Sequence, residues 1–142
     1  MMKKKKNNKG FSLVELIVVI AIMAVLVGVL APQFIKYVEQ SRQSTDIQNV
    51  EQLKTTVEVE CTSNQSITAA SIVISASGKT ATINTTGATI SGTSTSADLK
   101  SSTWQDVTIT YDVTTGAWST TNAALLDNTA TDGKSFKDIF GL

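Results

Sequence analysis

Histidine is absent from the 142-residue chain, and cysteine and proline occur once each. The lack of histidine removes the commonest general base and the commonest metal ligand. A lone cysteine, Cys61, excludes an internal disulfide, so an exported domain would owe its stability to packing or to assembly. The sequence also shows no nucleophile motif and no metal-binding motif. We therefore expect no enzymatic activity, no bound metal and no cofactor.

Positive charge is concentrated at the start of the chain. Five of the twelve basic residues are the lysines at positions 3, 4, 5, 6 and 9. Without residues 1–10, seven basic side chains stand against twelve acidic ones, which gives a net side-chain charge of −5. An acidic balance disfavours nonspecific nucleic-acid binding, so we expect no nucleic-acid partner.

The longest apolar run covers residues 11–31 and contains two polar side chains, Ser12 and Glu15. As a helix these 21 residues would rise about 31 Å, which matches the hydrocarbon core of a bilayer. The lysines before the run predict a cytoplasmic start, with everything after Ala31 outside. A carboxylate inside a bilayer costs roughly 2.5–3.5 kcal/mol, which marks Glu15 as a candidate functional residue.

The segment Gly10-Phe11-Ser12-Leu13-Val14-Glu15, after a lysine-rich leader and before an apolar run, resembles the class III signal peptide of type IV prepilins. The resemblance implies that a prepilin peptidase cuts between Gly10 and Phe11 and then methylates the new amino group of Phe11. It also implies that Glu15 acts in subunit assembly. The motif covers about the first third of the chain.

Two other interpretations fit the same stretch. An ordinary secretory signal would have an apolar region of about 7–15 residues, which is shorter than this one. A plain signal anchor would explain Glu15 as part of a capping box, in which Ser12 caps the helix and Glu15 reaches back to it. Neither interpretation explains why Gly10 and Phe11 stand at this junction.

Pro32 follows the apolar run, and Gly28 stands four residues before it. A proline inside a helix removes one hydrogen bond and usually kinks the helix. In the resembled family a proline at this place bends one long helix, so we expect a kink at Gly28 and Pro32. The alternative is that Pro32 ends the membrane span.

Residues 32–61 have the pattern of an amphipathic helix, and none after Pro32 is glycine or proline. The apolar stripe recurs at steps of mainly three and four residues: Phe34, Val38, Thr45, Ile47, Val50, Leu53, Val57 and Cys61. The charged residues between them are predicted to form a solvated face: Lys36, Glu39, Arg42, Asp46, Glu51, Lys54 and Glu58. We expect the stripe to pack on the rest of the chain, with Cys61 as a small buried residue.

Residues 62–142 are rich in serine, threonine, alanine and glycine, with alternating apolar positions. The pattern predicts one hairpin over residues 72–84 and a stronger one over residues 107–120. Residues 87–103 are predicted to be a polar loop or a weak edge strand, and residues 125–142 a short helix or a final strand. This head is poor in large apolar groups, so we expect it to need the helical stripe to complete its core.

Two groups of residues in the head invite a binding interpretation. Trp104, Tyr111 and Trp118 could line a ligand patch, but core packing is the better prediction. Three aspartates near the C-terminus could bind calcium, but their spacing does not match an EF-hand loop: Asp127, Asp132 and Asp138.

The sequence thus predicts an α+β fold, in which a long bent N-terminal helix carries a small antiparallel sheet. Residues 1–10 are the cleaved leader, 11–31 the membrane and filament-core helix, 32–61 the amphipathic helix and 62–142 the head. The resemblance implies a structural subunit of a type IV pilus, held in the cytoplasmic membrane before it joins a surface filament of identical copies for adhesion, motility or colonisation. Its partners would be the peptidase, the assembly platform and other copies.

Two alternatives stay open at this point. A minor pilin or pseudopilin of a type II secretion or DNA-uptake machine would share the N-terminus. A membrane-anchored binding domain would share only the apolar span.

Overall fold

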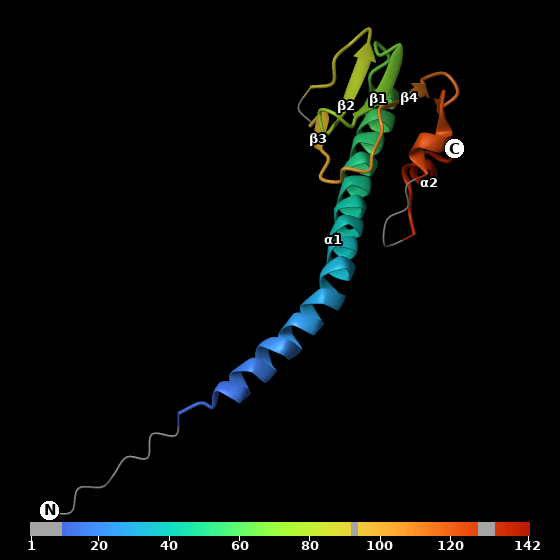
Figure 1. Ribbon diagram of the computed structural model, residues 1–142. Helices are drawn as coiled ribbons and strands as arrows, with labels where there is room; N and C mark the ends of the chain where they lie inside the picture. The colour runs from blue at the N-terminus through green and yellow to red at the C-terminus, as the bar shows by residue number, and fades with distance from the viewer. Residues whose placement is uncertain (1–9, 92–93, 128–132) are drawn as a thin grey trace, which may run out of the picture. The chain divides into compact units, whose positions relative to one another are not determined.

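The computed structural model describes residues 10–91, 94–127 and 133–142. The leader predicted at residues 1–10 lies outside the described residues except for Gly10. The described chain forms a long helix, five strands and two short C-terminal helices (Figure 1). Their order is α1 (Leu13–Ser63), β1 (Ala69–Ser75), β2 (Thr80–Thr86), β3 (Ser96–Asp98), β4 (Val107–Asp112), β5 (Ala117–Thr120), the 3-10 helix η1 (Ala123–Leu126) and α2 (Phe136–Phe140).

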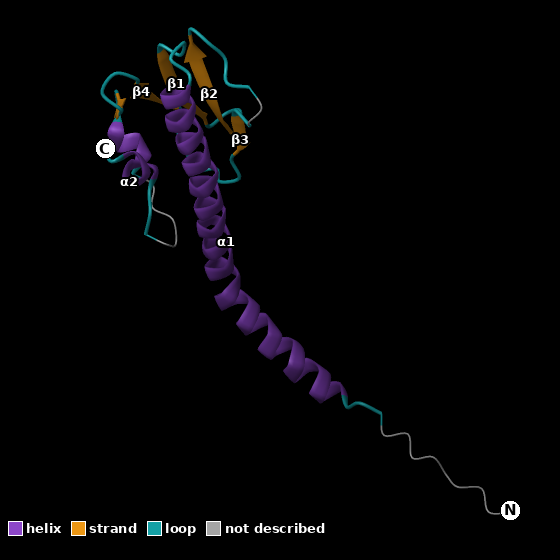
Figure 2. Ribbon diagram, turned by 180° about the vertical axis from the view of Figure 1, so that it is seen from behind, coloured by secondary structure: helices purple, strands orange, loops and turns teal. Residues whose placement is uncertain are grey.

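The chain divides into two compact units, residues 1–36 and residues 37–142. Helix α1 runs from the first unit into the second without a break in its helical assignment, as the purple ribbon in Figure 2 shows. Pro32 lies inside this helix, so the helix itself continues past it. Whether the membrane span ends at Pro32 is a separate point that the helix does not test. The kink expected at Gly28 and Pro32 stays a prediction.

The five strands form one antiparallel sheet in the order β3-β2-β1-β4-β5. Both predicted hairpins are present, because β1 pairs with β2 and β4 pairs with β5. Strand β1 also pairs with β4, which joins the two hairpins at the centre of the sheet. Within residues 87–103, three residues form the edge strand β3, as expected of a weak strand.

One face of the sheet is apolar and packs against residues of α1. Along β4 the side chains alternate strictly between buried and exposed, as predicted for a strand with one dry and one wet face. The core combines buried residues of α1 with those of the sheet, so the head does use the helical stripe as predicted. Its largest fully buried side chains include Ile47, Val50 and Val57 of α1 with Ile72 and Ile109 of the sheet.

The C-terminal segment closes the same core. Phe136 stacks on Trp104, with their ring centroids 4.1 Å apart, and Phe140 lies beside Trp118 at 4.8 Å. Helix α2 is fixed by a capping box, in which Ser135 and Asp138 bond to each other's backbone N–H groups. Trp104 and Tyr111 are buried, so core packing is confirmed for these two aromatic side chains.

The predicted solvated face of α1 is partly wrong. Asp46 is fully buried, at 0% exposure, whereas Phe34, placed on the apolar stripe, is 69% exposed. The side chains of α1 are exposed as far as Tyr37, half-buried from Val38 to Gln40, and buried for the first time at Gln43. Asp46 tolerates burial because each of its oxygens accepts hydrogen bonds, as described below.

Candidate functional site

The junction predicted for cleavage is open to solvent. Gly10 is exposed, and Phe11 is exposed over 88% of its surface. A Cβ atom built on Gly10 would meet nothing within 4 Å. Among the described residues, no contact requires glycine at this position.

Glu15 makes one hydrogen bond within its own helix. The backbone N–H of Ser12 donates to Oε2 of Glu15 over 2.8 Å, at the N-terminus of α1. This is the half of a capping box that the plain signal-anchor interpretation expects. Among the described residues, the second carboxylate oxygen of Glu15 has no hydrogen-bond partner, so this oxygen can accept a further hydrogen bond.

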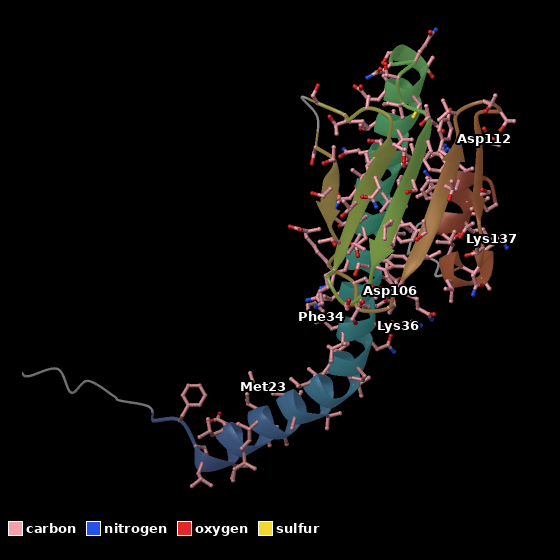
Figure 3. The ribbon with its side chains drawn as sticks, turned by 90° about the horizontal axis from the view of Figure 1, so that it is seen from above. Met23, Phe34, Lys36, Asp106, Asp112 and Lys137 are labelled. Atoms are coloured by element: carbon pink, nitrogen blue, oxygen red, sulfur yellow. The ribbon has the colours of Figure 1, made fainter. Side chains whose placement is uncertain are left out.

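The helix after Glu15 presents apolar side chains in every direction. Its large apolar residues from Phe11 to Leu30 are exposed over 44–88% of their surface, and Met23 in Figure 3 projects freely from the ribbon. This is the helix, among the described residues, that is long and apolar enough to cross a membrane. A surface of this extent is stable only in lipid or against other protein, because water makes apolar exposure costly.

Gly28 and Pro32 lie in the same exposed stretch. A Cβ atom on Gly28 would also meet nothing within 4 Å, so the glycine does not serve packing inside this chain. Pro32 has no N–H to donate to the carbonyl of Gly28, four residues earlier. The pair therefore weakens one turn of α1 without any compensating contact in the described chain.

A second group of polar side chains, here called the loop clamp, lies in the head and comprises Glu39, Gln43 and Asp46 of α1. Asp46 accepts hydrogen bonds from the backbone N–H groups of Lys100 and Ser101 and from Nε1 of Trp104, each over 2.8 Å. Two donors share Oδ2, and the third uses Oδ1. Three N–H dipoles thus replace the water that the buried carboxylate has lost.

Gln43 and Glu39 lie about one and two turns of the helix before Asp46 and extend the loop clamp. Oε1 of Glu39 accepts from Oγ of Ser101 over 2.6 Å and from the N–H of Ser102 over 3.1 Å. The Ser101 hydrogen bond is the main cause that lowers the pKa of Glu39 below its ordinary value. Nε2 of Gln43 donates to Oγ1 of Thr103 over 2.8 Å. About two turns of α1, from Glu39 to Asp46, therefore hold the segment between β3 and β4.

The chemistry of the loop clamp is structural. The carboxylate oxygens of Asp46 accept from backbone and indole N–H groups, and Glu39 accepts from a serine hydroxyl and a backbone N–H. The described residues include no cluster of three or more metal-ligating side chains. Of the aspartates considered for calcium, Asp138 caps its own helix, which lowers its pKa through the Ser135 hydrogen bonds. Asp132 lies outside the described residues.

Sequence reasoning missed the loop clamp, although a signal was present. Asp46 stands four residues before Val50 and seven before Leu53, so it lies on the apolar stripe itself. An acidic residue at a core position predicts a buried, hydrogen-bonded carboxylate. Its partners were not predictable, because they lie 54 to 58 residues away along the chain.

Comparison with known proteins gives matches at the N-terminus. A family model described as the prokaryotic N-terminal methylation motif matches residues 5–31. The type IV major pilin protein PilA of Myxococcus xanthus is 42% identical over 49 residues, which is 34% of this chain and 22% of that protein. The type IV major fimbrial protein FimA of Dichelobacter nodosus is 35% identical over 54 residues, or 38% of this chain and 35% of that protein.

A third relative is the prepilin peptidase-dependent protein A of Clostridium perfringens. It is 41% identical over 56 residues, which is 39% of this chain and 40% of that protein. The matched part therefore spans between about a fifth and two fifths of the length of these relatives. No solved structure matches the chain. The family model covers the Gly10–Phe11 junction and the apolar part of the helix.

Proposed function

We propose that the chain, a type IV pilin by the motif and the relatives of its N-terminal third, is the structural subunit of a type IV pilus filament. The observation that carries the proposal is the exposed apolar helix behind an open Gly10–Phe11 junction. Such a helix suits a protein that waits in a bilayer and then packs against its own copies. The named relatives support the same role, since two are major pilin or fimbrial proteins.

Processing is the first step of the proposed function. A prepilin peptidase removes residues 1–10 on the cytoplasmic side and methylates the amino group of Phe11. Replacement of Gly10 by leucine tests this step, because the added side chain meets nothing in the described fold and should not disturb it. We expect uncleaved precursor in the membrane, measured by mass and N-terminal sequencing.

A matched control for that variant is Gly28→Ala, which adds a side chain at an open glycine inside α1. We expect this control to be cleaved normally. Normal cleavage of the Gly10 variant would show that the junction is not the processing site.

Assembly is the second step, and we assign Glu15 to it. Leaving lipid for a filament core gives little hydrophobic gain, because both surroundings are apolar, so polar pairing has to fix the register. The new ammonium group of Phe11 in one subunit and Glu15 in its neighbour form such a pair. Within its own helix Glu15 already accepts from the N–H of Ser12, and its second oxygen serves the neighbour.

Glu15→Gln separates the two roles of this residue. Glutamine keeps an acceptor for Ser12 and so preserves the cap, but it leaves the neighbouring ammonium buried without a counter-charge. Breaking one side of a buried pair costs roughly 3–5 kcal/mol per contact. We expect the variant to be cleaved and to accumulate in the membrane without surface filaments, as seen by electron microscopy of sheared material.

The control is Glu51→Gln, at an exposed glutamate on the same helix. It should form filaments in normal number. Abundant filaments from the Glu15 variant, in cells without the wild-type subunit, would reduce Glu15 to a helix cap. In wild-type cells, the abundance of the chain in sheared filaments distinguishes a major subunit from a minor pilin or pseudopilin.

A further inference from the structure

The second face of the sheet carries small uncharged polar side chains. Strand pairing places Asn84, Ser71, Thr110 and Ser119 in one row across four strands. A parallel row places Thr82, Val73 and Thr108 side by side. Neighbouring strands lie about 4.8 Å apart, so these rows present hydroxyl and amide groups at short, regular intervals.

One end of this face is hollowed into a groove of about 450 Å³. Its walls come from the end of β1, the start of β4 and the segment that follows β5. The apolar part includes the half-buried Val73 and Leu125, and the polar part includes Asp106, Thr108, Thr121 and Asn122. Figure 3 labels Asp106 at this end of β4 and Asp112 at the other end.

Several polar groups of the groove have hydrogen-bonding capacity to spare among the described residues. Asp106 accepts from the N–H of Ala76 through Oδ1 over 2.6 Å, which leaves Oδ2 without a described partner. Asn122 occupies the N-cap position of η1, where asparagine normally bonds to the helix, but its side chain makes no cap bond. The groove thus offers carboxylate, amide and hydroxyl groups together.

We propose that this groove binds a neutral saccharide. Vicinal sugar hydroxyls both donate and accept, which suits an amide such as Asn122 and a free carboxylate oxygen such as that of Asp106. The small apolar floor at Val73 and Leu125 fits the C–H face of a sugar ring. A few placed polar groups over an apolar floor is the usual composition of a small-ligand site.

Other occupants fit the groove less well. No lysine or arginine lines it and one carboxylate does, so an anion would find no counter-charge. A lipid or an apolar protein surface would have to desolvate several polar side chains without pairing them. A cationic peptide would find a single charge at Asp106. The inference concerns the head and holds whether or not the chain assembles into filaments.

Nuclear magnetic resonance of the full chain tests the proposal. The protein is kept in a detergent without a sugar head group and titrated separately with glucose, galactose, mannose and N-acetylglucosamine. With at least one sugar we expect saturable shifts of the Asn122 side-chain amide and of the Ala76 N–H, which reports on Asp106. Asn122→Ala should weaken that binding about tenfold, the effect of one hydrogen bond.

Asn84→Ala is the matched control, because Asn84 is an exposed asparagine on the same face outside the groove. It should leave the affinity unchanged, and dispersed spectra of both variants show that they are folded. Three results would each overturn the proposal: no saturable shift with any sugar, equal binding by Asn122→Ala, or larger shifts at these groups from a lysine-rich peptide than from every sugar.

Discussion

Asp46 is the residue at which the structure makes the sharpest prediction about stability. Its carboxylate holds three N–H donors, two of which belong to the buried residues Ser101 and Trp104. The third donor belongs to Lys100, whose residue is exposed and can turn to water. Asp46→Ala therefore leaves two buried donors without acceptors.

The size of the effect follows from those two donors. A buried polar group without a partner costs about 1–3 kcal/mol, which gives about 2–6 kcal/mol for the pair. The alanine variant no longer buries a charge, which offsets part of this loss in the free energy of unfolding. We therefore expect a loss of about 2–4 kcal/mol in the free energy of unfolding, a large share of the roughly 5–15 kcal/mol typical of a domain.

Asp46→Asn should be milder. The asparagine oxygen can keep the two bonds of Oδ2 to Ser101 and Trp104, and the amide nitrogen then meets the N–H of the exposed Lys100. One charge-assisted bond is lost and one donor is turned to water, so the expected cost is about 1–2 kcal/mol. We therefore predict that Asp46→Ala lowers the free energy of unfolding more than Asp46→Asn does.

Urea unfolding of the full chain in detergent, followed by tryptophan fluorescence, measures these losses. Trp104→Phe keeps an aromatic ring against Phe136 but removes the indole donor, and Trp118 then reports the transition. In that background Asp46→Ala should cost about 1 kcal/mol less than in the wild type, because one of its orphaned donors is gone.

Glu51→Ala, on the exposed surface of α1, is the control and should change stability by less than about 0.5 kcal/mol. If Asp46→Ala unfolds at the same urea concentration as this control, the loop clamp does not stabilise the head. The reasoning from buried donors would then be refuted.

Two further predictions concern the head. The pKa of Glu39 is lowered in the folded chain, so its contribution to stability is present above its ordinary pKa of 4.5 and is lost as the pH falls through the lowered value. Glu39→Gln should therefore reduce the loss of stability at acid pH in a curve of unfolding free energy against pH. An unchanged loss at acid pH would contradict the assignment. Gly87 has a φ of +97°, and a Cβ atom there would overlap the carbonyl oxygen of Ser66, so Gly87→Ala should cost more than the roughly 1–3 kcal/mol of backbone strain. Gly116→Ala has a similar φ of +71° without that overlap, and equal melting temperatures for the two variants would disprove the clash.

The sequence predicted the elements of the fold where a strong local pattern exists. The stripe from Ile47 to Cys61 and the alternation along β4 each report burial directly, and the apolar run reports a helix of membrane-spanning length. The structure confirms the helix and both hairpins. The order of the strands was beyond such patterns, because the pairing of β1 with β4 depends on contacts about 40 residues apart. The loop clamp was missed for the same reason.

The N-terminal motif was predictable because its residues lie close together in the sequence. A peptidase reads a short segment, so Gly10, Phe11 and Glu15 stand within six residues of one another. The groove on the head has no such signature. Val73, Asp106 and Asn122 are scattered over about 50 residues, and only the folded sheet brings them together.

The two edge strands of the sheet are short, and this would matter in the proposed filament of many copies. β3 has three residues and β5 has four, whereas the interior strands have six or seven. An exposed edge offers unpaired N–H and C=O groups to any neighbouring strand, and a long edge invites uncontrolled sheet extension between chains. Heads crowded along a filament would meet edge to edge at very high local concentration. Edges of three and four residues give such accidental pairing few hydrogen bonds, so heads in the proposed filament would pack densely without their sheets joining.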